Sequence, residues 1–236
     1  MKGNYLNCAF QNLGDNNNIA IIGSSHASHL FYGLKEYYKG SSNSFSLFPV
    51  SSQSPFENLK ITSSDTHWLI QKAYDYILSS KNIKTVILAD YAANNVDYVD
   101  LNNPELTDSK EIYKKAVERT FEKLKKFKVL VLLDTPLLPF DPSLCNNRPY
   151  SFKKSKCSFV YKNETCIMHK NVISKVAKKY SNVKVFDLST LFCKDSKCKI
   201  KIKNKVMFMD NNHLNINGSL YVAPFVAEQI KKLQNH

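Results

Sequence analysis

The sequence predicts an α/β protein, a three-layer α/β/α doubly wound sandwich with a mostly parallel five-stranded sheet. Short and almost continuously apolar runs alternate along the chain with longer segments of helical spacing, which is the pattern of repeated strand–helix units. Apolar runs of this kind are typical of parallel strands that are covered on both faces. A chain of 236 residues, 43% of them hydrophobic, can also bury a substantial core.

The strands and helices follow one another in order. The clearest strand is the run Thr85-Val-Ile-Leu-Ala89, and the helix before it carries apolar side chains at helical spacing, among them Ile70, Ala73 and Ile77. An irregular stretch that contains cysteines is expected from 137 to about 163. The predicted strands are 18–22, 44–50, 85–89, 128–133 and 183–188, and the predicted helices are 26–39, 65–79, 104–126, 164–180 and 214–233.

The chain shows no internal repeat and no linker, so we expect residues 1–236 to form a single domain. No apolar run approaches the roughly 20 residues that a membrane span requires. The first residues lack the apolar core of a signal peptide. We therefore expect a domain excised from a longer, membrane-anchored protein.

The net charge of +13 restricts the class of partner. The lysines are scattered, and arginine, the better reader of phosphates and bases, occurs only at Arg119 and Arg148. This distribution fits a solvated lysine surface, or a surface that favours anionic glycans or lipid headgroups. It argues against nucleic acid as a partner.

Six cysteines leave three interpretations open: disulfides, buried thiols or a metal site. Cys193 and Cys198 enclose the short polar loop Lys-Asp-Ser-Lys, which suits a local disulfide. Cys145, Cys157 and Cys166 lie in a segment poor in core residues, where a further bridge would replace packing. The spacings contain no Cys-x-x-Cys pair, which disfavours zinc. Disulfides would indicate the periplasm or the cell surface.

Two short motifs near opposite ends of the chain suggest nucleophilic catalysis. An apolar strand ends at Gly23-Ser24-Ser25-His26, and Asp210-Asn-Asn-His213 precedes the last helix. A carboxylate three residues before a histidine can orient the imidazole, whose other nitrogen then accepts a proton from a serine hydroxyl. The alternative is that these serines, and Asp210, cap helices.

Serine early in the chain and Asp-x-x-His late in it resemble the SGNH (GDSL-like) hydrolases, which have a flavodoxin-like fold. A narrower resemblance is to the SGNH domain fused to acyltransferase type 3 membrane proteins, which O-acylate bacterial surface glycans. Three motifs carry this resemblance: Gly-Ser-Ser-His-Ala near the start, the pair Cys193-x4-Cys198, and Asp-x-x-His-Leu-x-x-x-Gly near the end. The resemblance implies Ser25 as nucleophile, His213 as general base and Asp210 as its partner. Ser24 replaces the aspartate that the family usually carries.

The resemblance also suggests oxyanion or substrate contacts. His26 stands beside the nucleophile, and Asn94 and Asn95 follow the third strand together with Asp90, although the family's glycine after the second strand is missing. The other histidines, His29 and His169 among them, have no partner at an informative spacing and are expected to be bystanders.

The implied function is transfer of an acetyl group from a membrane acyltransferase domain to a carbohydrate, through an acyl ester on Ser25 and without a cofactor or metal. A secreted carbohydrate acetylesterase with the same triad is the alternative among enzymes. A non-catalytic glycan-binding or docking domain is the alternative from another class. The oligomeric state, the glycan and the acyl donor do not follow from the sequence.

Overall fold

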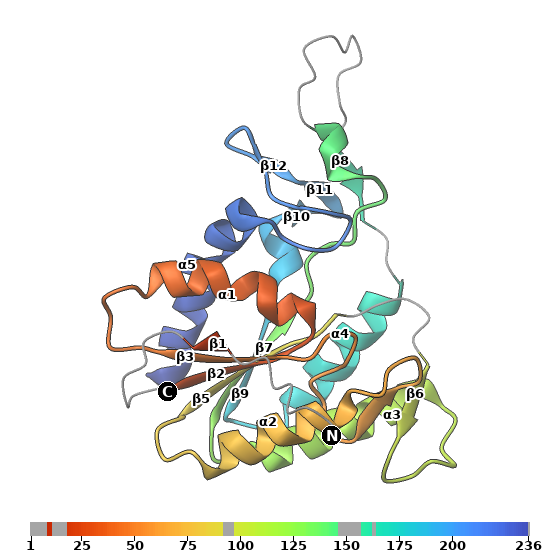
Figure 1. Ribbon diagram of the computed structural model, residues 1–236. Coiled ribbons are helices and arrows are strands. Elements are labelled where there is room, and N and C mark those ends of the chain that lie inside the picture. The colour runs from red at the N-terminus through yellow and green to blue at the C-terminus, as the bar shows by residue number, and fades with distance from the viewer. Residues whose placement is uncertain (1–8, 11–17, 92–96, 146–156, 162–163, 236) are drawn as a thin grey trace, which may run out of the picture.

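The computed structural model describes residues 9–10, 18–91, 97–145, 157–161 and 164–235 (Figure 1). At its centre is a six-stranded sheet with the order β1-β3-β2-β5-β7-β9. The sequence does not predict β1 (Ala9–Phe10), which pairs antiparallel with β3 at the edge. The other five strands are parallel and are those predicted: β2 (Ile19–Gly23), β3 (Phe45–Pro49), β5 (Thr85–Ala89), β7 (Lys128–Leu133) and β9 (Val183–Asp187).

Helices cover both faces of this sheet and complete the predicted three layers (Figure 1). On one face α1 (Ser25–Tyr37) packs along α5 (Ile216–Gln234). The opposite face is covered by α2 (His67–Ser79), α3 (Ser109–Lys123) and α4 (Glu164–Ala177). Helix α3 begins later than predicted because Asp108 caps it, its carboxylate accepting the N–H of Glu111 at 2.7 Å.

Alternate residues of the parallel strands enter different cores. In β2, Ile19 and Ile21 pack with α1 and α5, whereas Ala20 and Ile22 pack with α2 and α3. All four are completely buried. The double burial explains why these strands read as continuous apolar runs rather than as an alternation of apolar and polar residues.

The strand order places a switch point at the carboxyl ends of β2 and β5. The chain runs from β2 to β3 on one side and then crosses to β5 on the other side. In open α/β sheets, a crevice for ligands forms at the carboxyl edge where the order of strands reverses. A ligand site is therefore expected at the segments that follow β2 and β5.

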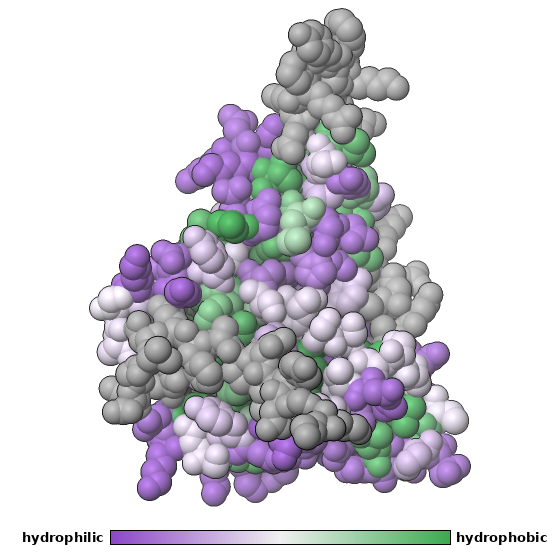
Figure 2. All heavy atoms as spheres, viewed as in Figure 1, coloured by the Kyte–Doolittle hydropathy of each residue, from purple (hydrophilic) through white to green (hydrophobic). Residues whose placement is uncertain are grey.

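A group of short strands lies beyond the carboxyl ends of the sheet, and we call it the strand lobe (Figure 1). The lobe comprises β8 (Ser158–Val160), β10 (Cys193–Lys194), β11 (Lys197–Lys199), β12 (Lys201–Ile202) and β13 (Lys205–Val206). Hydrophilic side chains gather around its β12–β13 hairpin (Figure 2).

The remaining short elements are a strand pair and two 3-10 turns. Away from the lobe, β4 (Leu59–Ile61) pairs with β6 (Tyr98–Asp100). The 3-10 turns occupy Pro142–Cys145 and Leu188–Leu191.

One predicted disulfide is present and a second is not. Cys193 and Cys198 face each other across β10 and β11 and are bonded. The prediction of a further bridge among Cys145, Cys157 and Cys166 is wrong, because Cys145 and Cys157 are thiols. Cys145 is completely buried in the core on the α1–α5 side, so packing holds this cysteine in place without a bridge. The side chain of Cys166 lies outside the described residues.

Within the described residues, no helix combines the length and the apolar character that crossing a bilayer demands.

Candidate active site

The turn after β2 is shaped by the close approach of β5. Gly23 pairs with Ala89 in the parallel ladder, and a Cβ atom on Gly23 would lie 1.8 Å from the carbonyl oxygen of Ala89. The same carbonyl accepts the N–H of Ser24 at 3.3 Å. Only glycine therefore fits at the end of this strand, and the chain turns directly from β2 into α1.

Ser24, rather than Ser25, caps the helix. The Ser24 hydroxyl accepts the N–H of His26 at 3.2 Å, and its carbonyl accepts the N–H of Ala27 at 3.0 Å. Ser24 is also almost completely buried. Since the cap is already supplied, the hydroxyl of Ser25, the first residue of α1, is not needed for it.

Ser25, His213 and Asp210 form one hydrogen-bonded chain, as the two motifs predict. The Ser25 Oγ and His213 Nε2 atoms lie 2.7 Å apart. On the other side of the ring, His213 Nδ1 and Asp210 Oδ2 lie 2.8 Å apart. The geometry is that of a hydroxyl, a base and a carboxylate that orients the base.

The Asp-x-x-His segment closes on itself before the last helix begins. Asp210 Oδ1 accepts the N–H groups of Asn212 and His213, at 2.9 and 2.7 Å. Helix α5 is capped by a different residue, Asn215, whose side chain accepts the N–H of Gly218 at 3.0 Å. Asp210 therefore does not cap α5, and its second oxygen is available to the imidazole.

These bonds determine the charge of Asp210 and the tautomer of His213. Burial acts to raise the pKa of Asp210, but the N–H groups of Asn212 and His213 and the His213 ring outweigh it and hold the pKa below its ordinary value. The ionised Asp210 accepts a hydrogen bond from the N–H group at His213 Nδ1, so the proton stays on the ring. In the neutral imidazole, Nε2 is then the acceptor and faces the Ser25 hydroxyl.

A second histidine–aspartate pair lies next to the hydrogen-bonded triad of Ser25, His213 and Asp210. His26 Nδ1 and Asp134 Oδ1 are 2.6 Å apart, and both side chains are buried. The His26 ring stacks on Tyr91, with ring centroids 4.7 Å apart, and lies 5.0 Å from the ring of His213. His26 is thus part of the wall of the site, and its contact with substrate stays a prediction.

His29, expected from its spacing to be a bystander, lies in the site next to His213. Its Nδ1 accepts the N–H of Leu214 at 3.2 Å, which ties α1 to the residue after His213. Burial, followed by the neighbouring His26 and His213, lowers the pKa of His29 well below its ordinary value. A neutral His29 fits its acceptor role. The sequence held one sign of this position: His29 follows His26 by three residues, about one helical turn, so the two rings lie on the same face of the helix.

The loops after β3 and β5 are joined through Asp90. The Ser54 hydroxyl donates to Asp90 Oδ2 at 2.8 Å, and the Tyr113 hydroxyl lies 3.4 Å from the same oxygen. In the loop after β3, where the family's glycine is missing, Ser52 adopts the left-handed φ of 57° that glycine favours. The predicted contacts Asn94 and Asn95 lie outside the described residues.

Among the residues that the structure describes, no three His, Cys, Asp or Glu side chains are grouped closely enough to hold a metal ion.

Comparison with known proteins gives a family and several related folds. The family model for the SGNH domain fused to AT3 domains matches residues 2–228. No protein of curated function matched the sequence.

Three solved structures share the fold at low sequence identity. The periplasmic domain of a lipopolysaccharide acetyltransferase from Salmonella ser. Paratyphi A has a TM-score of 0.72 and 20% identity, over 93% of this chain and 85% of that one. An aryl esterase from M. smegmatis has a TM-score of 0.57 and 13% identity, over 92% and 99%. The C-terminal catalytic domain of peptidoglycan O-acetyltransferase A from Streptococcus pneumoniae has a TM-score of 0.50 and 14% identity, over 94% and 97%.

Proposed function

This chain belongs to the family of SGNH domains fused to AT3 domains, and we propose that it transfers an O-acetyl group to a bacterial surface carbohydrate through an ester on Ser25. The single observation that carries the proposal is the bond of 2.7 Å between Ser25 Oγ and His213 Nε2, with Asp210 on the far side of the ring. The related acetyltransferase folds support the same class of reaction.

In the first step, His213 Nε2 takes the proton of Ser25 as the hydroxyl oxygen attacks the carbonyl carbon of the acetyl donor. Asp210 stabilises the imidazolium that forms. The tetrahedral intermediate then expels the donor's leaving group, which receives the proton from His213. The product of this step is acetyl-Ser25.

In the second step, the acceptor hydroxyl gives its proton to His213 and attacks the acetyl-Ser25 carbonyl. The ester bond to Ser25 breaks, and the proton returns from His213 to the Ser25 oxygen. A sugar hydroxyl as acceptor makes the protein a transferase, and water makes it an esterase.

Negative charge on the carbonyl oxygen requires donors in both steps. Ser25 is the first residue of α1, where backbone N–H groups have no partner within the helix and the helix dipole is positive. We assign its N–H as one oxyanion donor. Asn94 and Asn95 are our candidates for the second donor, and His26 for a wall of the substrate site.

The family's fusion to AT3 domains supports a membrane acyltransferase domain as the source of the acetyl group. We propose that residues 1–236 act as one domain outside the cytoplasm, beside such a partner. The Cys193–Cys198 disulfide supports this location, because disulfides persist in oxidising compartments.

The alternative of a carbohydrate acetylesterase uses the same triad and differs only in the acceptor. A docking domain without catalysis is less well supported, because such a domain has no need of a serine held 2.7 Å from an oriented histidine.

Trapping the ester tests the proposal. The protein is mixed with p-nitrophenyl acetate, quenched in acid and digested, and the peptides are analysed by mass spectrometry. We expect one acetyl group on Ser25, released faster when a sugar acceptor is present. Release at the same rate with and without acceptors supports the esterase, and the absence of acetyl-Ser25 contradicts both enzymes.

A further inference from the structure

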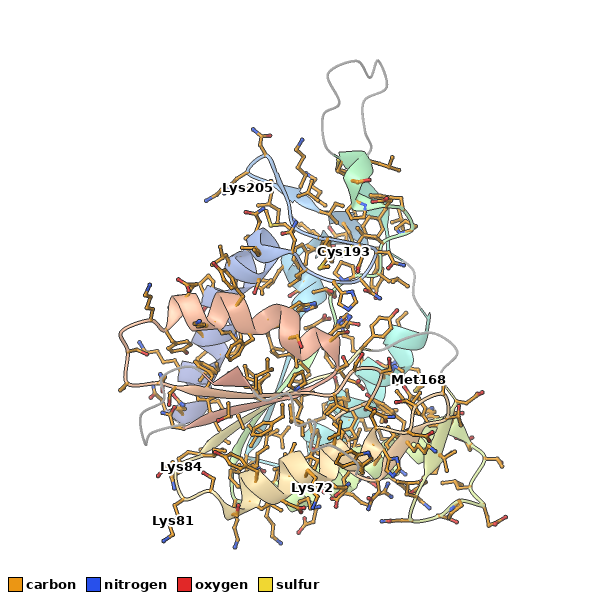
Figure 3. All side chains as sticks on the ribbon, in the orientation of Figure 1. Lys72, Lys81, Lys84, Met168, Cys193 and Lys205 are labelled. Atoms are coloured by element: carbon orange, nitrogen blue, oxygen red, sulfur yellow. A yellow bond between two sulfur atoms is a disulfide. The ribbon has the colours of Figure 1, made fainter. Side chains whose placement is uncertain are left out.

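A cavity of about 290 Å³ lies at the carboxyl ends of β7 and β9, between helix α4 and the strand lobe. The lining includes Asp134, directly after β7, Asp187 at the end of β9, His169 and Ile173 from α4, and Cys193 from the lobe. Figure 3 labels Cys193 on the lobe and Met168, the neighbour of His169, on α4. We call this space the α4 cavity.

The α4 cavity reaches the neighbourhood of Ser25. Its lining includes Asp90, which follows β5, and β5 is the strand next to β2. Adjacent strands are roughly 5 Å apart, so the end of the cavity at Asp90 lies about one strand spacing from Ser24, the residue that follows β2 and precedes Ser25. Asp134, also in the lining, holds His26, the neighbour of Ser25.

Two buried polar groups in the lining are suited to hydroxyl groups. His169 is only 2% exposed, and its Nδ1 has no hydrogen-bond partner among the described residues, while Nε2 lies 3.2 Å from the Tyr98 hydroxyl. Burial lowers the pKa of His169 to about 4, so its ring is neutral near pH 7. Burial raises the pKa of Asp90 to about 7, so this carboxyl both donates and accepts hydrogen bonds near neutral pH.

The charged groups of the lining are already matched. Lys170 forms an ion pair with Asp187, and Asp134 pairs with His26. An anionic ligand would meet two buried carboxyl groups and a neutral histidine. The remaining walls include Leu133, Ile167 and Ile173, which offer apolar surface. Apolar walls with a few convergent polar groups are the usual composition of a small-molecule site.

We propose that the α4 cavity binds one uncharged monosaccharide unit of the acceptor glycan. A sugar ring combines apolar C–H faces with a rim of hydroxyl groups, which matches the leucine and isoleucine walls and the two polar groups His169 and Asp90. The cavity size admits one ring rather than several. The assignment rests on the proposed function, because it identifies the sugar as the acceptor of the acetyl group.

Methyl NMR of the intact chain tests this proposal. Protein labelled at isoleucine δ1 methyl groups is titrated to about 50 mM with the methyl glycosides of glucose, galactose, mannose and rhamnose. Parallel titrations use glucuronate as a charged sugar and 1-hexanol as an apolar probe. Ile167 and Ile173 report on the cavity, and Ile19 and Ile230, buried in the opposite core, serve as controls.

We expect at least one neutral glycoside to shift the Ile167 and Ile173 signals saturably, without moving those of Ile19 and Ile230. His169→Leu should weaken that affinity at least tenfold, because it removes the polar nitrogen and keeps an apolar side chain. Ile167→Trp gives a second test that spares the fold, since Ile167 is 53% exposed at the cavity. It should also weaken binding, by narrowing the entrance.

The proposal is overturned if no neutral glycoside shifts the two signals, if glucuronate or hexanol alone does so, or if both variants bind as the wild type does. Ser25→Ala separates this result from the proposed function. The variant should bind the glycoside unchanged, because the sugar is held by the cavity and not by the ester. Sugar binding without Ser25-dependent transfer would refute the function alone, and transfer without sugar binding would refute the cavity alone.

Discussion

Ser25 and His213 are separated by 188 positions in the sequence, and their Oγ and Nε2 atoms lie 2.7 Å apart. Two independent local structures bring them together. Gly23 and the Ser24 cap present Ser25 at the first turn of α1, and Asp210 folds the loop before α5 around His213. His29 joins these structures through its bond to Leu214. Each can be tested separately.

Replacing Ser25 should remove activity and spare stability, whereas replacing the adjacent Ser24 should lower stability and spare activity. Ser25→Ala should abolish acetyl transfer and leave the melting temperature nearly unchanged, because no cap and little apolar area are lost. Ser24→Ala should retain acetyl-Ser25 formation but cost about 1 kcal/mol of stability through loss of the N-cap. Glycan acetylation by cells that express each full-length variant, with thermal melts, makes the comparison. Normal acetylation by Ser25→Ala would show that the domain is a docking module.

Asp210→Asn should be less damaging than Ser25→Ala. An asparagine can keep the two bonds to the N–H groups of Asn212 and His213 but turns an amide toward His213 Nδ1, which favours the wrong tautomer. We expect the rate of acetyl transfer to fall roughly 10²- to 10⁴-fold without vanishing. Steady-state kinetics with a fixed acceptor provides the measurement. A loss as complete as that of Ser25→Ala would contradict a merely orienting role.

Asp90 should make the folded state less stable as the pH rises. Its pKa is 3.8 when unperturbed and about 7 in the folded protein, because burial opposes ionisation. Below about pH 4 both states hold the proton, and between pH 4 and 7 only the unfolded state releases it. Stability should therefore decline across that window by up to roughly 4 kcal/mol and stay level above it.

Asp90→Asn isolates this contribution, because the amide keeps the shape of the carboxyl group and does not titrate. The variant should gain stability over the wild type at pH 8 and differ little from it at pH 4. Urea unfolding at a series of pH values gives the two curves. Parallel curves for the two proteins would show that Asp90 is not the group responsible.

The disulfide should contribute modestly to stability. Cys193 and Cys198 enclose a short loop, for which the chain-entropy argument gives about 2 kcal/mol. Cys193→Ser with Cys198→Ser should lower the free energy of unfolding by about that amount. A non-reducing digest of the wild type should contain the two cysteines in one linked peptide pair. Recovery of both as thiols from protein made in an oxidising compartment would contradict the bridge and the proposed location.

Much of the fold was determined by the sequence alone, because its signals are local. A strand buried on both faces must be apolar at every position, so the runs at 18–22 and 85–89 mark β2 and β5 directly. The same holds for Asp210 and His213, whose bond closes within one turn, and for Cys193 and Cys198, which face each other across a tight hairpin. That the serine motif and the histidine motif act together was predicted from the resemblance to the SGNH hydrolases, which carry the two motifs in the same order along the chain.

Other features depended on the tertiary structure. Ser24 and Ser25 are equally good caps in sequence, and only the approach of β5 to Gly23 and the position of His213 separate their roles. The pairing of His26 with Asp134 joins residues 108 positions apart, and the bond from Leu214 to His29 spans 185. The lobe strands are two or three residues long, too short for a periodic pattern. Such contacts are decided by which strands become neighbours, and sequence spacing carries no record of that order.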